Sequence, residues 1–147
     1  MNSQIASLIA GILLIPISSL LATAHTPPPG SEERKAICDA LRTYLAERAT
    51  QRLPQAIVFK VDILRVDGPF AWFEGIPLFK DGSATTDYLA DQGYTFILHS
   101  GTHAWNVIHD LSRSDVPADS ELTQLRKELR AVPSSVIPDF WRQLLKR

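Results

Sequence analysis

The sequence predicts an α+β fold: an N-terminal helix packed on a curved four-stranded antiparallel sheet, with C-terminal helical segments. Three observations carry this prediction. Apolar residues recur at helical spacing in the first third of the chain, at Ala36, Ile37, Ala40, Leu41, Tyr44 and Leu45. Two pairs of strand-like segments follow, and each pair is joined by a short turn. Helical spacing then returns at Leu122, Leu125 and Leu129.

The first helix is expected from about Glu32 to Ala49. Ser31 is a suitable N-cap, and Glu32 and Glu33 place negative charge in the first turn, where the helix dipole favours it. Pro54 prevents any continuation of the helix.

The first hairpin is expected from residues 57–66 and 70–79, which alternate between apolar and other side chains. A three-residue turn, Asp67-Gly68-Pro69, keeps the faces of the two strands consistent, whereas a two-residue turn would mix them. The expected cross-strand pairs are Val66 with Phe70, Ile63 with Phe73, Phe59 with Pro77, Leu64 with Trp72, and Asp62 with Glu74.

The second hairpin is expected from residues 94–100 and 103–111 around the loop Gly101-Thr102. This register pairs Phe96 with Val107 and Leu98 with Trp105. Residues 119–146 are then expected to fold back on the domain, because Leu122, Leu125, Leu129, Phe140, Trp141, Leu144 and Leu145 form apolar clusters that favour burial.

Composition limits the classes of function. The chain has 147 residues, with 15 Lys and Arg against 16 Asp and Glu, a formal net charge of −1. Nucleic-acid binding needs clustered cations, so this charge gives no support for it. Cys38 is the single cysteine of the sequence, so neither an intramolecular disulfide nor a cysteine-based metal cluster can form.

The N-terminus has the pattern of an export signal. Residues 5–21 are apolar with a few serines, and Ala22-Thr23-Ala24 has the small-x-small form of a cleavage site. We therefore expect a signal peptide at 1–24, a Pro-rich leader at 25–30, the α+β core at 31–117 and a helical segment at 118–147. Periplasmic or secreted protein, without membrane insertion after cleavage, is the expected product. An uncleaved N-terminal membrane anchor is the alternative.

The order of helix, hairpin and hairpin on one curved sheet resembles the cystatin-like and nuclear-transport-factor-2-like α+β rolls. The runs SEERKAICDALR, VDILRVDGPFAWFEGIP and HAWNVIHDLSRSDVP resemble small exported proteins of Gram-negative bacteria whose function is unassigned. The resemblance covers about residues 31–117. It implies a fold and an exported location, and it brings no catalytic residue with it.

Asp62 and Glu74 are the sharpest candidates for chemistry. In the expected register these carboxylates are cross-strand neighbours, and two close carboxylates raise each other's proton affinity, as in acid–base pairs. Lys60 is expected on the same face, where it would neutralise one of them. The alternative is a solvated sheet face on which Lys60 relieves the repulsion.

Trp72, Trp141 and Lys60 are the candidates for a ligand or partner face. Strand alternation places Trp72 and Phe73 on opposite faces, so one of them needs cover from the C-terminal helices or from a partner. No metal site is expected, since His103 and His109 lie roughly 20 Å apart along one strand and His99 points to the other face. Cys38 is expected to be a buried, inert thiol, and no cofactor motif is present.

The first functional hypothesis is an exported, non-enzymatic module that binds an unknown protein or small ligand through the second sheet face or the hairpin loops. A small hydrolase or isomerase that uses Asp62 and Glu74 is the second. A structural or toxin-neutralising envelope protein is the third. A second face closed by residues 118–147 would exclude the enzyme hypothesis, and the sequence leaves the oligomeric state open.

Overall fold

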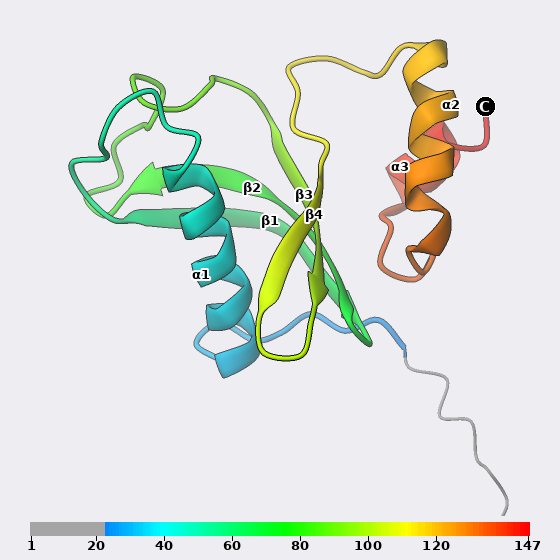
Figure 1. Ribbon diagram of the computed structural model, residues 1–147, viewed down its shortest axis with the longest axis horizontal. Coiled ribbons are helices and arrows are strands. Elements are labelled where there is room, and N and C mark those ends of the chain that lie inside the picture. Colours follow the sequence, from blue (N-terminus) through cyan, green and yellow to red (C-terminus); the bar gives the residue numbers. More distant parts are fainter. Residues whose placement is uncertain (1–22) are drawn as a thin grey trace, which may run out of the picture.

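A computed structural model describes residues 23–147 and has the predicted α+β architecture. Helix α1 (Glu32–Ala46) precedes an open antiparallel sheet of four strands in sequential order: β1 (Ile57–Asp67), β2 (Phe70–Phe79), β3 (Tyr94–Ser100) and β4 (Trp105–Asp110). The tail holds α2 (Asp119–Glu128), the 3₁₀ helix η1 (Leu129–Ala131) and α3 (Asp139–Leu144). Figure 1 shows α1 on one side of the sheet and α2 with α3 on the other.

Residues 1–22 of the expected signal peptide (1–24) lie outside the described part of the chain. Only its last two residues, Thr23 and Ala24, are described. The leader that follows is held against the sheet. The backbone N–H of His25 donates to the carbonyl of Val66 (2.8 Å), and the N–H of Val66 donates back to His25 (2.8 Å). The imidazole Nε2 of His25 contacts Glu33 Oε2 at 2.7 Å, and Pro27 is buried. The leader therefore belongs to the folded domain.

Helix α1 begins as the sequence predicts. The Ser31 hydroxyl accepts a hydrogen bond from the backbone N–H of Arg34 at 3.3 Å, which satisfies one of the free donors of the first turn. The helix ends at Ala46, earlier than the expected Ala49. Its apolar stripe, Ile37, Leu41 and Leu45, is buried on the sheet.

The first hairpin corrects the predicted register. Its loop has two residues, Gly68 and Pro69, and it pairs Asp67 with Phe70. Gly68 supplies the positive φ, 54°, that such a tight loop requires at its first position. Asp62 is an extra residue in a β-bulge, which restores consistent faces, so Leu64 pairs with Phe73 while Phe59 still pairs with Pro77.

The second hairpin has a longer loop than predicted, whereas the loop of the first is shorter. Residues 101–104 connect the strands, so Ser100 pairs with Trp105 and Leu98 with Val107. A second bulge, at Ile108, changes the face of the rest of β4 and brings His109 opposite Ile97. Next to the turn, residues of β3 therefore pair two positions further along β4 than predicted: Leu98 pairs with Val107 and not with Trp105.

Each face of the sheet carries its own core. Toward α1 lie Leu64, Val66, Ala71, Phe73, Phe96 and Leu98. Toward the tail, Trp72 and Ile97 pack with Leu122, Leu125, Leu129, Val136, Trp141 and Leu144. The expectation that the tail folds back is confirmed, with one correction: Trp141 is buried, whereas Phe140 is 61% exposed.

Candidate functional site

The predicted carboxylate pair does not form. Asp62 is the extra residue of the bulge in β1 and is exposed, and Ile63 takes its place opposite Glu74. Glu74 lies between Ile63 and Thr95 in the sheet, with no second carboxylate as its cross-strand neighbour. The arrangement therefore lacks the paired carboxylates on which the acid–base hypothesis depended.

Glu74 instead binds two tryptophans. Its Oε1 atom accepts a hydrogen bond from the indole Nε1 of Trp72 at 2.8 Å and another from that of Trp141 at 3.0 Å. The two indoles meet edge to face, with centroids 5.6 Å apart, and are 0% and 5% exposed. Both indoles are thus part of the core between sheet and tail, where they present no surface to a partner.

Lys60 lies on the part of the second face that the tail leaves uncovered. It is exposed and pairs with Ile76, which is 44% exposed. Among residues 23–147, Lys60 takes part in no ion pair. This surface is exposed to solvent, and Lys60 lies far along β1 from Arg65, the partner of Trp72.

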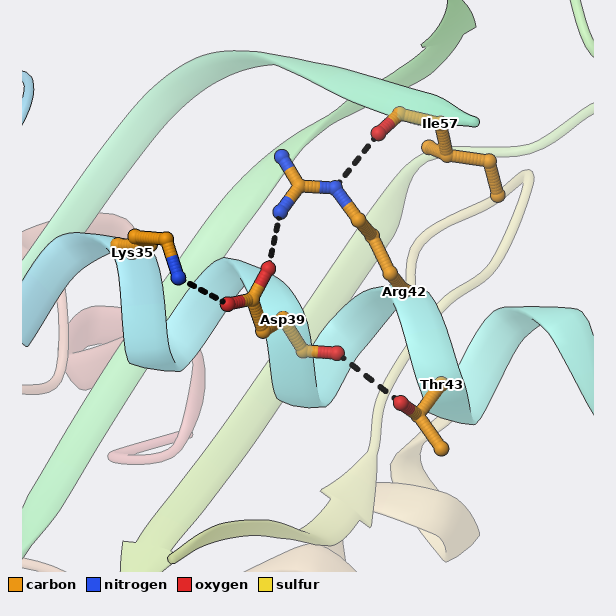
Figure 2. A network of polar contacts seen from close by, with 5 residues as sticks. All are labelled: Lys35, Asp39, Arg42, Thr43 and Ile57. Carbon is orange, nitrogen blue, oxygen red and sulfur yellow. Dashed lines mark hydrogen bonds and ion pairs between the residues drawn. The ribbon is translucent and has the colours of Figure 1, made fainter. Parts of the chain in front are cut away.

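A charged network ties α1 to the beginning of β1 (Figure 2). Asp39 Oδ2 receives a hydrogen bond from Lys35 Nζ at 3.1 Å, and Oδ1 receives one from Arg42 Nη1 at 2.6 Å. Arg42 Nε also donates to the carbonyl of Ile57 at 2.6 Å. The Lys35 hydrogen bond is the main reason why the pKa of Asp39 lies below its usual value. These contacts satisfy the cations internally and give the network a structural role.

Cys38 is buried beside this network and is one of the residues that line a small groove between α1 and β1. Burial raises the pKa of its thiol, although Arg42 and Arg34 oppose the shift. No histidine lines this groove, so a general base for a cysteine nucleophile is missing there.

The histidines are placed differently from the prediction. His103 lies in the exposed β3–β4 loop, and His99 and His109 share the tail-side face because of the bulge at Ile108. The His99 ring packs against Phe70, and His109 Nδ1 lies 3.9 Å from Glu128 Oε2. In the described part of the chain, no three His, Cys, Asp or Glu residues gather as metal ligands would.

The strongest candidate site is an open groove of about 740 Å³ between α1 and the β3–β4 hairpin, which we call the α1–β4 groove. This volume lies within the range of ligand sites, roughly 300–1,000 Å³. One wall is residues 100–107, and the other is the side of α1 that bears Ala36, Asp39, Ala40, Thr43, Tyr44 and Glu47.

Small residues on the helix open the groove. Ala36 and Ala40 lie one turn apart on α1 and leave space opposite the half-buried Trp105 and Val107. Tyr44 is fixed in place: its hydroxyl donates to Asp110 at 3.0 Å, and the Arg48 guanidinium lies 3.4 Å from its ring centroid. The groove thus offers an apolar floor with a preformed shape.

Sequence reasoning missed this site because it treated Ala36 and Ala40 as part of the apolar stripe. The signal that was available is their size, since alanine at two successive turns cannot fill the space beside a tryptophan. The predicted two-residue loop also misplaced Trp105 along the strand, because the four-residue loop sets Trp105 opposite Ser100 and not opposite Leu98.

Comparison with protein-family models, curated proteins and solved structures found no match to this chain. Within residues 23–147, the helices are too short or too polar to cross a bilayer. The function is therefore argued from the α1–β4 groove itself.

Proposed function

We propose that this protein is an exported, non-enzymatic binding module of the bacterial envelope and that the α1–β4 groove is its ligand site. The observation that carries the proposal is that the groove is lined by the apolar side chains of Trp105 and Val107 together with polar groups of Asp39, Thr43 and Asn106. A concave apolar surface with a few polar groups is typical of ligand sites.

The tail covers the part of the second face that carries Glu74, which favours binding over catalysis. The hydrolase or isomerase hypothesis required Asp62 and Glu74 to converge in an open cavity. Glu74 is bound to two buried indoles and Asp62 points into solvent from the bulge, so this chemistry has no site there. The α1–β4 groove contains His103 and two carboxylates, but His103 is exposed on its loop and makes no hydrogen bond within residues 23–147 that would orient it as a base.

The test is a mixed screen of small molecules and short peptides against the isotope-labelled exported protein, read from backbone amide signals. Hits should shift the signals of residues 100–107 and of the adjoining side of α1. Hits that map to Lys60 and Ile76, or a screen without hits, would contradict the proposal.

Two matched variants sharpen this screen. Ala36→Phe places a large side chain in the groove and should abolish binding of the hits, while Ala46→Phe adds the same side chain at an exposed position of α1 outside the groove. Ala46→Phe should bind as the unmodified protein does. Equal effects of the two substitutions would place the site elsewhere.

A further inference from the structure

We propose that the ligand of the α1–β4 groove is an extended segment of another protein, which adds to β4 as a fifth strand of the sheet. This inference rests on the proposed function and names its ligand class. The segment should carry one large apolar side chain for the groove and a basic residue beside it.

The first argument is the open edge of β4. The strand is the last in the sheet, and an antiparallel ladder turns some of its backbone N–H and C=O groups away from β3. Among residues 23–147, no backbone hydrogen bond outside the helices and strands involves Trp105–Asp110. In the same described part of the chain, no side chain forms a hydrogen bond with the backbone of β4. The side chain of Asn106 donates its Nδ2 hydrogen to Ala104 in the loop instead. These groups are free for a strand from outside.

The second argument is the contrast with the other edge of the sheet. At β1, His25 of the leader pairs with Val66 through two backbone hydrogen bonds, and Arg42 Nε occupies the carbonyl of Ile57. The bulge at Asp62 and the prolines of the leader discourage further pairing. Proteins protect their edge strands in such ways. Strand β4 also has a bulge, at Ile108, but its part before the bulge, Trp105–Val107, has no pairing of this kind within residues 23–147.

The third argument is that the open edge borders a groove of suitable shape. The regular part of β4, Trp105–Val107, lies before the bulge at Ile108 and forms one wall of the α1–β4 groove. Alternate residues of an added strand point to the same side. An apolar side chain of that strand would therefore reach Ala36 and Ala40, while its neighbours point away from the groove.

The fourth argument is charge. Asp39 and Glu47 line the groove, and its lining contains no Lys or Arg side chain. Asp39 already binds Lys35 and Arg42, whereas Glu47 is 68% exposed at the rim, where its nearest cation is Arg48 at 3.7 Å. A basic residue in the segment complements Glu47, and an acidic one would be repelled. Strand addition supplies affinity through the backbone and selectivity through such side-chain contacts.

The experiment selects displayed random octapeptides on the exported protein and then studies synthetic copies of the selected peptides. Bound peptide should slow hydrogen exchange by at least tenfold at those amides of Trp105–Val107 that face away from β3. N-methylation of the peptide should weaken binding more than tenfold at alternate positions, whose N–H groups face β4, and less than threefold at the positions between them. The Ala36→Phe variant should lose the peptide, and Ala46→Phe should keep it.

Several results would overturn the inference. One is a selection that yields no binding peptide. Another is a bound peptide that is insensitive to N-methylation or protects amides away from β4. A third is a dimer of this chain that already pairs its β4 strands without peptide. If small molecules bind the groove and peptides do not, the ligand class proposed here is wrong while the binding function stands. Exchange and N-methylation are measured on the unmodified chain, so a folding defect in Ala36→Phe would not obscure the result.

Discussion

Glu74 is the residue whose role changes most between sequence and structure. A single carboxylate oxygen accepts from two indoles, Trp72 and Trp141, which come from opposite sides of the second core. Glu74→Ala should lower the free energy of unfolding by about 2–4 kcal/mol, because two buried N–H donors lose their acceptor. Urea denaturation followed by circular dichroism measures this loss.

Glu74→Gln is the matched control for that substitution. Glutamine keeps an acceptor oxygen but loses the negative charge, so a smaller loss, about 1 kcal/mol, is expected. If alanine and glutamine destabilise the protein equally, the two indole hydrogen bonds contribute nothing measurable.

Cys38 should be unreactive in the folded protein. Burial raises the pKa of its thiol, so the fraction of reactive thiolate near neutral pH is lower than in the unfolded chain. Alkylation by iodoacetamide at pH 8 should be at least about tenfold slower in native buffer than in urea. Equal rates would mean that α1 leaves Cys38 accessible.

Among the elements, α3 should contribute strongly to stability through one side chain. Trp141→Ala removes a buried indole from the second core and should cost about 3–5 kcal/mol. The neighbouring Phe140 is 61% exposed, and Phe140→Ala should cost less than about 1 kcal/mol. Thermal and urea melts of both variants test this difference. Similar losses at the two positions would contradict the way α3 is seated.

The helices and strands were predictable because their signals are local. Ser31 caps α1 as expected, and the spacing of Leu122, Leu125 and Leu129 located the helical tail. The cross-strand partners were not predictable, because a bulge adds one residue without a local sequence signal. The bulge at Asp62 separated the expected pair Asp62 and Glu74, and so removed the predicted chemical site.

The α1–β4 groove escaped prediction for the same reason at a larger scale. It lies where Ala36 and Ala40 of α1 face Trp105, and the four-residue loop before β4 sets the position of Trp105 opposite Ser100. The covering of the second face was predictable in outline, since an apolar tail needs a surface on which to pack.

At the scale of the whole molecule, export is a prediction that rests on the sequence of residues 1–24. Cleavage after Ala24 would leave His25 as the first residue, and its backbone nitrogen would still be able to donate to Val66. Mass spectrometry of periplasmic or secreted protein should therefore find a chain that begins at His25. Cytoplasmic protein that retains Met1 would contradict export.

The central claim is that the tail covers the second face of the sheet around Trp72 and Ile97 and leaves the α1–β4 groove as the ligand site. The three tryptophans of the chain report on both halves of this claim. The indole N–H groups of Trp72 and Trp141 are bonded to Glu74, whereas that of Trp105 has no partner within residues 23–147 and Trp105 borders the groove.

The most direct test is hydrogen exchange of the three indole N–H signals of the free protein, measured by NMR. The account predicts that the Trp105 indole exchanges rapidly and that those of Trp72 and Trp141 exchange at least about a hundredfold more slowly and at similar rates, since one opening of the tail exposes both. Rapid exchange at Trp72 and Trp141 would show that the tail is a free arm and the second face is open. This result would contradict the account.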